Sequence, residues 1–208
     1  MGPVGDYRGM TTLSDIRTRV RLDLRDSDSS SERWSDDQLD RHIGRALHDM
    51  DRHVPRETLA TIATTPGSRD IDLASLTGLI EVEAAEYPVD QYPPSYVQFS
   101  RWDQALTLLV DPVPDGDDVR LSYTAVHVLD GSGSTVPGHL EELLAIGAAG
   151  YAALELASFN TNALTLDARA AEEYSRQGRA WLTAFQQLLR HHARSNAVRN
   201  RRLYRPAS

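Results

Sequence analysis

The sequence predicts an α+β protein: a helical bundle of about four main helices with an inserted small antiparallel β-sheet. Two observations carry this prediction. Apolar residues recur at helical spacing near both ends of the chain, over 12–55 and 137–193, whereas β-branched and aromatic runs separated by turns fill 56–130. At 208 residues the chain is long enough for one domain with its own core, so we expect a single domain over 1–208.

The first helix should begin at Thr12, after a mobile arm at 1–11 that holds three Gly and one Pro. Apolar residues recur every three or four positions over 13–24, and Thr12 and Asp15 are placed to cap the first turn. The stretch 26–32 is rich in Ser and Asp, whose side chains compete with the helix for backbone hydrogen bonds. We therefore expect a loop there that contributes nothing to a core.

The second helix has a strong start signal. Ser35 and Gln38 form a capping box, and Trp34 directly precedes the cap, where it can pack on Leu39 as a hydrophobic staple. One apolar face then continues until Pro55 ends the helix. The two N-terminal helices are therefore expected within 12–55.

The middle of the chain, 56–130, predicts a small antiparallel sheet of short strands. Turn signals at 66–67, 93–94 and 114–116 supply the restricted or positive backbone angles that a reversing chain needs. The runs expected to form strands are 58–64, 80–86, 96–102, 106–110 and 119–126.

Two longer helices should follow a flexible Gly-Ser connector at 131–134. Pro137 opens the first, which should run to about Ser158, and Gly147 and Gly150 permit another helix to approach closely. The last helix is expected from about Asp167, and its apolar pattern fades beyond residue 189. This places the two C-terminal helices within 137–193 and leaves 194–208 as a basic tail.

Two residue types are absent from the sequence, since it holds no Cys and all 22 basic residues are Arg. Without Cys there is no disulfide, thiol nucleophile, cysteine zinc site or iron–sulfur cluster. Without Lys there is no phosphate-loop lysine, Schiff base or pyridoxal phosphate attachment. No apolar run approaches the roughly 18 residues that span a bilayer, and no export signal is evident. We expect no membrane segment, no cofactor and no catalytic residue.

Several residue groups resemble sites, but each has a plainer interpretation. His42, Asp49 and His53 share a helical face, yet the two histidines lie roughly 16 Å apart along the axis, so a solvated face is favoured over a metal site. The pair His191-His192 lacks a nearby carboxylate and is expected on the surface. The 131–134 segment lacks the lysine of a phosphate loop. The acidic pairs expected on exposed helix surface are Glu141-Glu142 and Glu172-Glu173.

Charge is distributed very unevenly along the chain. Up to Glu173 there are 14 arginines against 30 acidic residues, a balance of −16, whereas from Tyr174 onward there are eight arginines and no acid, a balance of +8. A basic C-terminus can bind phosphates, dock on an acidic protein surface, or serve only as a disordered solubilising tail. Leu203 and Tyr204 lie within the basic run and favour docking, because they give the tail something to bury.

Three stretches of the chain resemble the head-to-tail adaptor proteins of tailed bacteriophages, also called connector or head completion proteins. They are 13–17 (Leu-Ser-Asp-Ile-Arg), 34–39 (Trp-Ser-Asp-Asp-Gln-Leu) with the amphipathic helix ending at Val54-Pro55, and 86–94 (Glu-Tyr-Pro-Val-Asp-Gln-Tyr-Pro-Pro). The β-rich segment and the two Ala-rich helices after it look like those of longer members that carry an insertion. The resemblance covers most of the chain.

This resemblance implies a structural protein of the virion neck, assembled in the host cytoplasm, without catalytic function. It implies a homo-oligomeric ring, commonly of twelve subunits, that sits beneath the portal protein and extends the channel toward a stopper or tail-terminator protein. Genomic DNA would pass through the ring without sequence-specific binding. The C-terminal segment would reach the portal, and the portal-docking candidates are Arg194, Arg199, Arg201, Arg202, Leu203, Tyr204 and Arg205.

Two other classes of function stay open at this point. The arginine-rich C-terminal helix could lie along a nucleic-acid groove, which would make the protein a nucleic-acid-binding regulatory protein. A hydrolase with a site assembled from distant histidines and carboxylates is the third class, although nothing in the sequence specifies its substrate.

Overall fold

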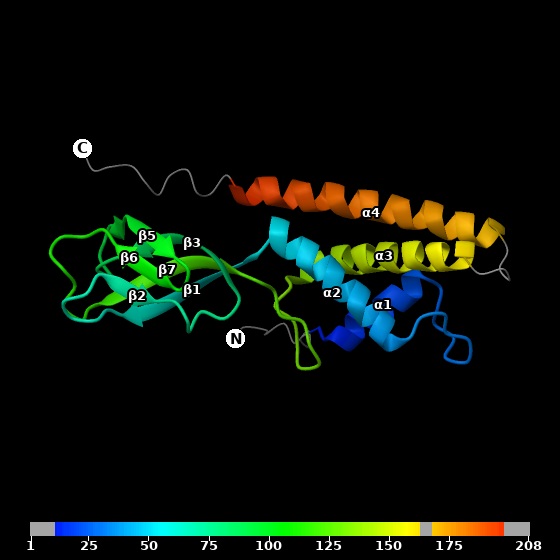
Figure 1. Ribbon diagram of the computed structural model, residues 1–208, viewed down its shortest axis with the longest axis horizontal. Helices are drawn as coiled ribbons and strands as arrows, with labels where there is room; N and C mark the ends of the chain where they lie inside the picture. The colour runs from blue at the N-terminus through cyan, green and yellow to red at the C-terminus, as the bar shows by residue number, and fades with distance from the viewer. Residues whose placement is uncertain (1–10, 163–167, 198–208) are drawn as a thin grey trace, which may run out of the picture. The chain divides into compact units, whose positions relative to one another are not determined.

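The structure is a computed structural model of the chain, and it describes residues 11–162 and 168–197. They fold into two compact units: a helical unit, made of the described residues in 1–54 and 127–194, and a β-rich unit, residues 55–126. The helices α1 to α4 and two small antiparallel sheets give the α+β class that the sequence predicts (Figure 1). The expectation of a single adaptor domain over 1–208 stays a prediction.

Helix α1 (Leu13–Asp23) begins and ends with recognisable caps. Thr12 and Asp15 form the expected N-terminal capping box. At the other end Asp26 N–H donates to Arg21 O at 2.8 Å and Arg25 N–H donates to Leu22 O at 3.1 Å, which is the Schellman pattern of bonds. Arg25 occupies the left-handed position of that motif, with φ of 54°.

Helix α2 (Asp36–His53) starts at the Ser35–Gln38 capping box, as the sequence predicts. Trp34, just before the cap, is only 2% exposed, and its indole Nε1–H donates to Ala152 O at 3.3 Å. Its ring also meets Tyr174 edge to face, with centroids 6.1 Å apart. Trp34 therefore joins the start of α2 to both long C-terminal helices.

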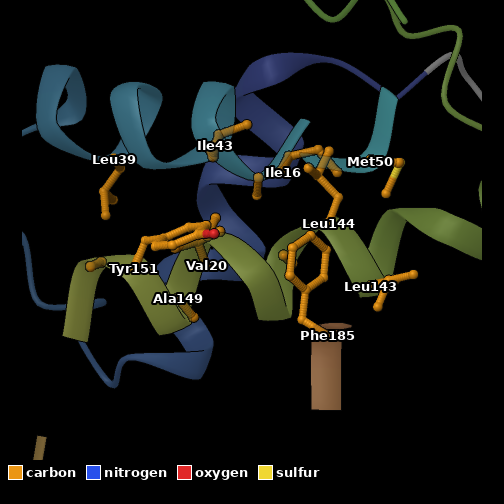
Figure 2. Packing of buried hydrophobic residues seen from close by; sticks show 14 of the residues in the cluster. Ile16, Val20, Leu39, Ile43, Met50, Leu143, Leu144, Ala149, Tyr151 and Phe185 are labelled. Atoms are coloured by element: carbon orange, nitrogen blue, oxygen red, sulfur yellow. The ribbon is translucent and has the colours of Figure 1, made fainter. Parts of the chain in front are cut away.

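Helix α3 (Glu141–Asn162), preceded by a 3-10 turn at Gly138–Leu140, is the centre of the helical unit. Ala, Leu and Gly cover almost its whole circumference, and residues on every side are buried (Figure 2). A helix that is apolar all round is surrounded by its neighbours and does not turn a single face to the core. The buried residues labelled in the figure are Ile16, Val20, Leu39, Ile43, Met50, Leu143, Leu144, Ala149, Tyr151 and Phe185.

Helix α4 (Ala168–Ala197) packs closely on α3 through glycines. A Cβ added at Gly147 would lie 2.9 Å from the Phe185 ring, and one added at Gly178 would lie 3.0 Å from Gly150 O. The helix continues to Ala197, past the expected end of the C-terminal helices at 193, and the basic tail at 194–208 stays a prediction. The helix extends about two turns beyond the apolar pattern that fades after residue 189, because backbone hydrogen bonding does not require a buried face.

The β-rich unit holds seven strands in two sheets. The four-stranded sheet has the order β1-β7-β3-β4 and the three-stranded sheet the order β2-β6-β5, all antiparallel. Their bounds are β1 Arg56–Ala63, β2 Asp70–Asp72, β3 Leu79–Glu86, β4 Tyr96–Val97, β5 Phe99–Trp102, β6 Ala105–Leu108 and β7 Asp118–Ala125.

The sequence predicts one sheet of about five strands in this region, whereas the structure has seven strands in two sheets. The expected strand 96–102 is split by Gln98 into β4 and β5, which pair in different sheets. Strand β2 was not expected, because Asp70 and Asp72 enclose a single apolar residue, Ile71. That residue is 2% exposed and packs with Leu106 and Leu108 in the core of the unit.

The connector after the β-rich unit is not a flexible linker. The Asp130 carboxylate accepts hydrogen bonds from Ser132 N–H at 2.7 Å and Gly133 N–H at 3.1 Å, and Leu129 bridges to Ser134. Leu13 N–H donates to Asp130 O at 2.9 Å, which ties the turn to the start of α1. An aspartate before Gly-Ser residues closes an Asx turn, a local pairing that composition alone does not reveal.

Candidate interaction surfaces

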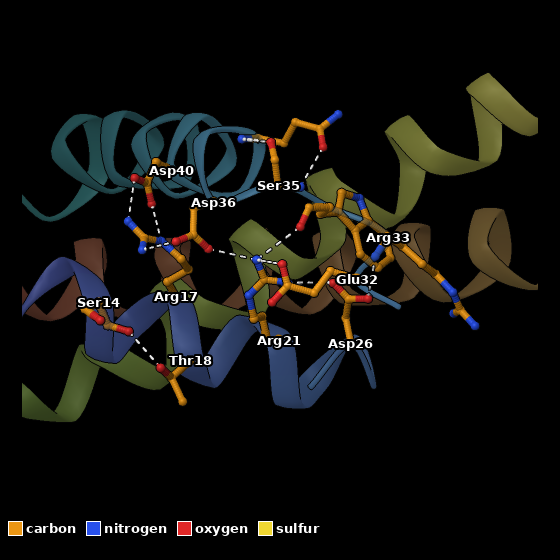
Figure 3. Close-up of polar contacts among 12 residues, drawn as sticks. Ser14, Arg17, Thr18, Arg21, Asp26, Glu32, Arg33, Ser35, Asp36 and Asp40 are labelled. Carbon is orange, nitrogen blue, oxygen red and sulfur yellow. Dashed lines mark hydrogen bonds and ion pairs between the residues drawn. The ribbon is translucent and has the colours of Figure 1, made fainter. Parts of the chain in front are cut away.

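A network of ion pairs holds α1 against the start of α2 (Figure 3). The Arg17 guanidinium lies 2.7 Å from the carboxylates of both Asp36 and Asp40. Its hydrogen bonds to Asp40 raise the pKa of Arg17, so the guanidinium stays charged. Arg21 meets Asp36 from the other side at 2.8 Å, and its hydrogen bond lowers the pKa of that carboxyl.

The loop between α1 and α2 is anchored by a carboxylate that the sequence analysis had left in solvent. Asp26 is 4% exposed; it pairs with Arg21 at 2.8 Å and accepts a hydrogen bond from Arg33 N–H at 2.8 Å. The expectation that 26–32 contributes nothing to the interior was therefore wrong at this residue. A buried charge is tolerated here because it has both a cation and a backbone donor.

His42 was expected on a solvated helix face, and this is wrong. It is 3% exposed, and its Nε2 lies 3.2 Å from a carboxylate oxygen of Glu155, which also pairs with Arg41. Burial lowers the pKa of His42, and the Glu155 charge opposes this shift. The residue fills space between α2 and α3, as its position next to Ile43 allows.

Asp49 and His53 do not form a metal site with His42. The Asp49 carboxylate accepts a hydrogen bond from the Tyr151 hydroxyl, and Arg45 stacks 4.0 Å from the centroid of that ring. His53 is exposed, with Nδ1 2.9 Å from the backbone oxygen of Asp49. Across residues 11–162 and 168–197 we find no group of three or more His, Asp or Glu able to hold a metal ion.

The acidic pairs on the long helices have different surroundings. Glu141 is 8% exposed and pairs with Arg19 at 2.9 Å, so the expectation of an exposed pair fails at this residue. Glu142 is exposed, as are Glu172 and Glu173. Burial of Glu141 follows from its place at the first turn of α3, where α1 passes close by.

The exposed side of α4 is basic. Arg176, Arg179 and Arg190 recur at helical spacing and are exposed, and Arg176 also pairs with Glu173. His191 is exposed as expected, and His192 is partly buried, with its ring 5.9 Å from that of His139. These residues continue the positive charge that the sequence assigns to the C-terminus.

The predicted portal-docking residues fall almost entirely outside the described structure. Arg194 belongs to α4, although its side chain is not described. The others, Arg199, Arg201, Arg202, Leu203, Tyr204 and Arg205, lie outside the described residues. Their role stays a prediction.

Two surface features were missed by sequence reasoning. The first is a pocket of about 460 Å³ in the helical unit, lined by residues from the end of α1, the following loop and α4. Its walls include Leu24, Arg25, Arg33, Tyr174 and Trp181. The sequence feature that could have indicated this pocket is Arg25, an arginine where a helix end usually has glycine. It can be recognised only when the end of α1 is known.

The second feature is an exposed tryptophan at the β5–β6 hairpin of the β-rich unit. Trp102 is 81% exposed and borders a shallow hollow of about 400 Å³ together with Asp70, Asp72 and Asp103. The sequence analysis had placed Trp102 at the end of a strand without distinguishing its face. An exposed indole is a side chain that a partner protein can bury, because tryptophan is enriched among the residues that dominate binding energy at interfaces.

No helix within the described residues is both long enough and apolar enough to cross a bilayer. Charged side chains are exposed on both units, and the described residues hold no group of three or more His, Asp or Glu able to bind a metal ion. The sequence pattern of the family described as SU10 adaptor protein matches residues 11–207, and the chain belongs to this family. Membership of this family makes it a structural adaptor protein.

Two solved structures are similar to the chain, each at 16% sequence identity and a TM-score of 0.30. One is the neck of an empty gene transfer agent particle, with 68% of this chain and 77% of that chain covered. The other is the virion of a native gene transfer agent particle, with 73% and 82% covered. No curated protein sequence matches. The alternative of a nucleic-acid-binding regulatory protein finds no support in these comparisons.

Proposed function

We propose that this adaptor forms a ring beneath the portal protein of a phage-type particle, extends the DNA channel and connects it to a stopper or tail-terminator protein. The observation that carries the proposal is the family match over 11–207. The partners are further copies of the chain, twelve in the ring as is common among such adaptors, together with the portal and the next protein of the neck. The site of action is the virion neck, after assembly in the host cytoplasm.

The charge distribution supports this role. A predominantly acidic body repels the DNA backbone, so genomic DNA slides through the ring without sequence-specific binding. The β-rich unit alone carries twelve acidic residues against four arginines, a balance of −8. No metal, cofactor or catalytic group is needed for a protein that acts as a connector.

The same charge predicts how the protein behaves before assembly. Subunits with strongly negative bodies repel each other, so the isolated chain is monomeric or weakly associated and forms its ring on a portal template. Static light scattering at micromolar concentration and low salt tests this. A stable dodecamer without partner would refute the repulsion argument and leave the adaptor role intact.

The C-terminal segment is the proposed portal-docking element. Arg199, Arg201, Arg202 and Arg205 can make charge-assisted hydrogen bonds to an acidic groove of the portal, and Leu203 and Tyr204 supply apolar anchors. Since α4 ends at Ala197, residues 198–208 can be removed without cutting the helix.

Truncation after Ala197 tests the docking proposal. The free energy of unfolding should change by less than about 1 kcal/mol, as for tails without core contacts, while attachment to filled heads should be lost. A matched full-length variant with the four arginines replaced by Gln separates charge from chain length. Normal attachment of the truncated chain to heads would show that the body carries the portal contact.

A further inference from the structure

Arg25 occupies a backbone position that disfavours it. It is the left-handed residue of the Schellman motif after α1, with φ of 54°, where glycine avoids the clash of a Cβ atom. The other described non-glycine residues with positive φ are Asp90 and Asp103, a type that tolerates this conformation. A strained arginine on the surface indicates that its side chain is needed for a contact.

The Arg25 side chain borders the 460 Å³ pocket of the helical unit, opposite two aromatic residues. Arg33 also lines the pocket, donates a hydrogen bond to the Tyr174 hydroxyl and lies 5.8 Å from the centroid of its ring. Trp181 and Leu24 add apolar wall. The pocket therefore offers two guanidinium groups beside a flat apolar surface.

The pocket also has two acidic residues, Asp23 and Glu173, in its wall. Glu173 is neutralised by its ion pair with Arg176 on the same helix. Asp23 also lines the pocket, and burial and the neighbouring Glu142 raise the pKa of its carboxyl. Neither Arg25 nor Arg33 has a carboxylate partner among the described residues. An apolar group flanked by negative charge is the ligand that fits.

The β5–β6 hairpin presents such a group. Trp102 pairs with Ala105 across a two-residue turn made by Asp103 and Gln104, and φ of 51° at Asp103 gives the tight reversal. The indole is 81% exposed, and the carboxylates of Asp70, Asp72 and Asp103 surround the hollow beside it. Arg101, the cation next to it in sequence, is engaged with the backbone oxygen of Ile80 at 2.9 Å.

We propose that the Trp102 hairpin of one copy docks into the Arg25–Arg33 pocket of a neighbouring copy. The indole would stack among Tyr174, Trp181 and the guanidinium groups, and the aspartates beside it would pair with Arg25 and Arg33. A pocket of 460 Å³ has room for an indole together with one flanking side chain. This contact rests on the proposed ring, because it joins one subunit to the next.

The symmetry of the contact argues for a second copy as the occupant. Each chain carries one hairpin and one pocket, so the contact is head-to-tail and can repeat from one subunit to the next around the proposed ring. Opposite charges at the contact offset the repulsion between acidic bodies and fix how one subunit is oriented against the next. One such small contact is weak alone and becomes effective when a template holds subunits together.

Arg25→Gly separates this contact from a structural role of the residue. Glycine relieves the strained position, so the unfolding midpoint should stay the same or rise, while incorporation into heads that lack their own adaptor should fall at least about tenfold, the loss of roughly one good charge contact. Arg52→Gln, another exposed arginine without a partner among the described residues, is the matched control. Trp102→Ala should reduce incorporation similarly, with the fully exposed Tyr92→Ala as its control.

Disulfide trapping identifies the partner directly, because the chain has no Cys of its own. Heads assembled with the double variant Gln104→Cys and Gln177→Cys should give a ladder of covalent oligomers on mild oxidation. A mixture of the two single variants should give dimers only. Asp115→Cys, at another exposed acidic turn, combined with Gln177→Cys should leave monomers.

The outcomes distinguish this contact from the adaptor role. A ladder in the double variant, together with reduced incorporation of Arg25→Gly and Trp102→Ala, supports the docking. Monomers only, a disulfide closed within one chain, or unchanged incorporation of both variants overturns it, even when the neck is fully occupied. If the unaltered chain itself fails to join heads, the proposed function is wrong instead.

Discussion

The helical unit and the β-rich unit treat their apolar residues differently. In the helical unit α3 is enclosed on nearly every side, and α4 approaches it closely enough for glycines to be required at the contact. Of the ten large apolar side chains that are exposed among the described residues, seven belong to the β-rich unit, including Tyr92 and Trp102. The helical unit therefore encloses most of its large apolar side chains, and the β-rich unit leaves more of them exposed to solvent.

Electrostatics follow the same division. In the helical unit Arg17 and Arg21 are enclosed by carboxylates that fasten one helix to another. In the β-rich unit Arg120 pairs with Glu86 and Asp90, yet the unit keeps a strong negative excess. The charges of the helical unit form ion pairs between its helices. The uncompensated carboxylates of the β-rich unit give its surface a negative electrostatic potential.

The largest effect is expected at Trp34, the aromatic residue that connects α2 with the C-terminal helices. Trp34→Ala should lower the free energy of unfolding by about 3 to 5 kcal/mol, through lost packing and a cavity. Urea unfolding followed by circular dichroism measures it. An unchanged midpoint would mean that Trp34 serves a partner and that the helical unit has no tight core at this point.

Glycine contacts between α3 and α4 should give the next largest effect. Gly178→Ala places a Cβ 2.9 Å from Leu154 and 3.0 Å from Gly150 O, and overpacking of this kind costs about 1 to 3 kcal/mol. Gly44→Ala on α2 is the matched control, since nothing lies within 4 Å of its added Cβ. It should stabilise the helix by about 0.5 to 1 kcal/mol. Equal effects of the two changes in thermal unfolding would show that α4 is not held close to α3.

A smaller effect concerns pH. Burial lowers the pKa of His42 below its ordinary 6.5, so the unfolded chain takes up the proton first as pH falls. Stability should therefore decrease as pH falls through about 6.5, and His42→Gln should flatten this part of the profile. The exposed His53→Gln should not. Identical pH profiles for the two variants, measured by urea unfolding between pH 5 and 7.5, would contradict burial as the cause.

The smallest effect on stability is expected in the β-rich unit. Trp102→Ala and Tyr92→Ala should change the free energy of unfolding by less than about 0.5 kcal/mol, because these rings are exposed. Chemical denaturation of these two variants and of Trp34→Ala under the same conditions compares the loss of unfolding free energy in the two units. A loss above 2 kcal/mol at Trp102 would show that the hairpin belongs to a core.

Much of the helical unit is predictable from sequence because its signals are local. The capping boxes at Thr12 and Ser35 involve residues three positions apart, and both appear as expected. The burial of His42 and Glu141 was missed, since each depends on a helix that arrives from elsewhere in the chain. Sequence periodicity gives a residue's face and does not identify what covers that face.

In the β-rich unit the strands were largely foreseen and their pairing was not. The division into two sheets depends on which strands meet, for example β3 with β7 across some forty residues. The candidate contact surfaces were missed for a related reason. Arg25 is notable only by its backbone angle and Trp102 only by its exposure, and neither is a property of spacing. The charge asymmetry, which needs no geometry, was read from sequence alone.

The β-rich unit leaves and rejoins the helical unit through neighbouring chain segments. Arg56 pairs with Ala125 at the ends of β1 and β7, and within the helical unit His127 N–H donates to Asp51 at 2.8 Å while its ring lies 3.1 Å from Val54 O. A module whose two ends lie side by side can be inserted or deleted by one genetic event, with the helix packing undisturbed. The chain geometry at this junction is therefore compatible with an insertion that leaves the helical unit's own hydrogen bonds in place.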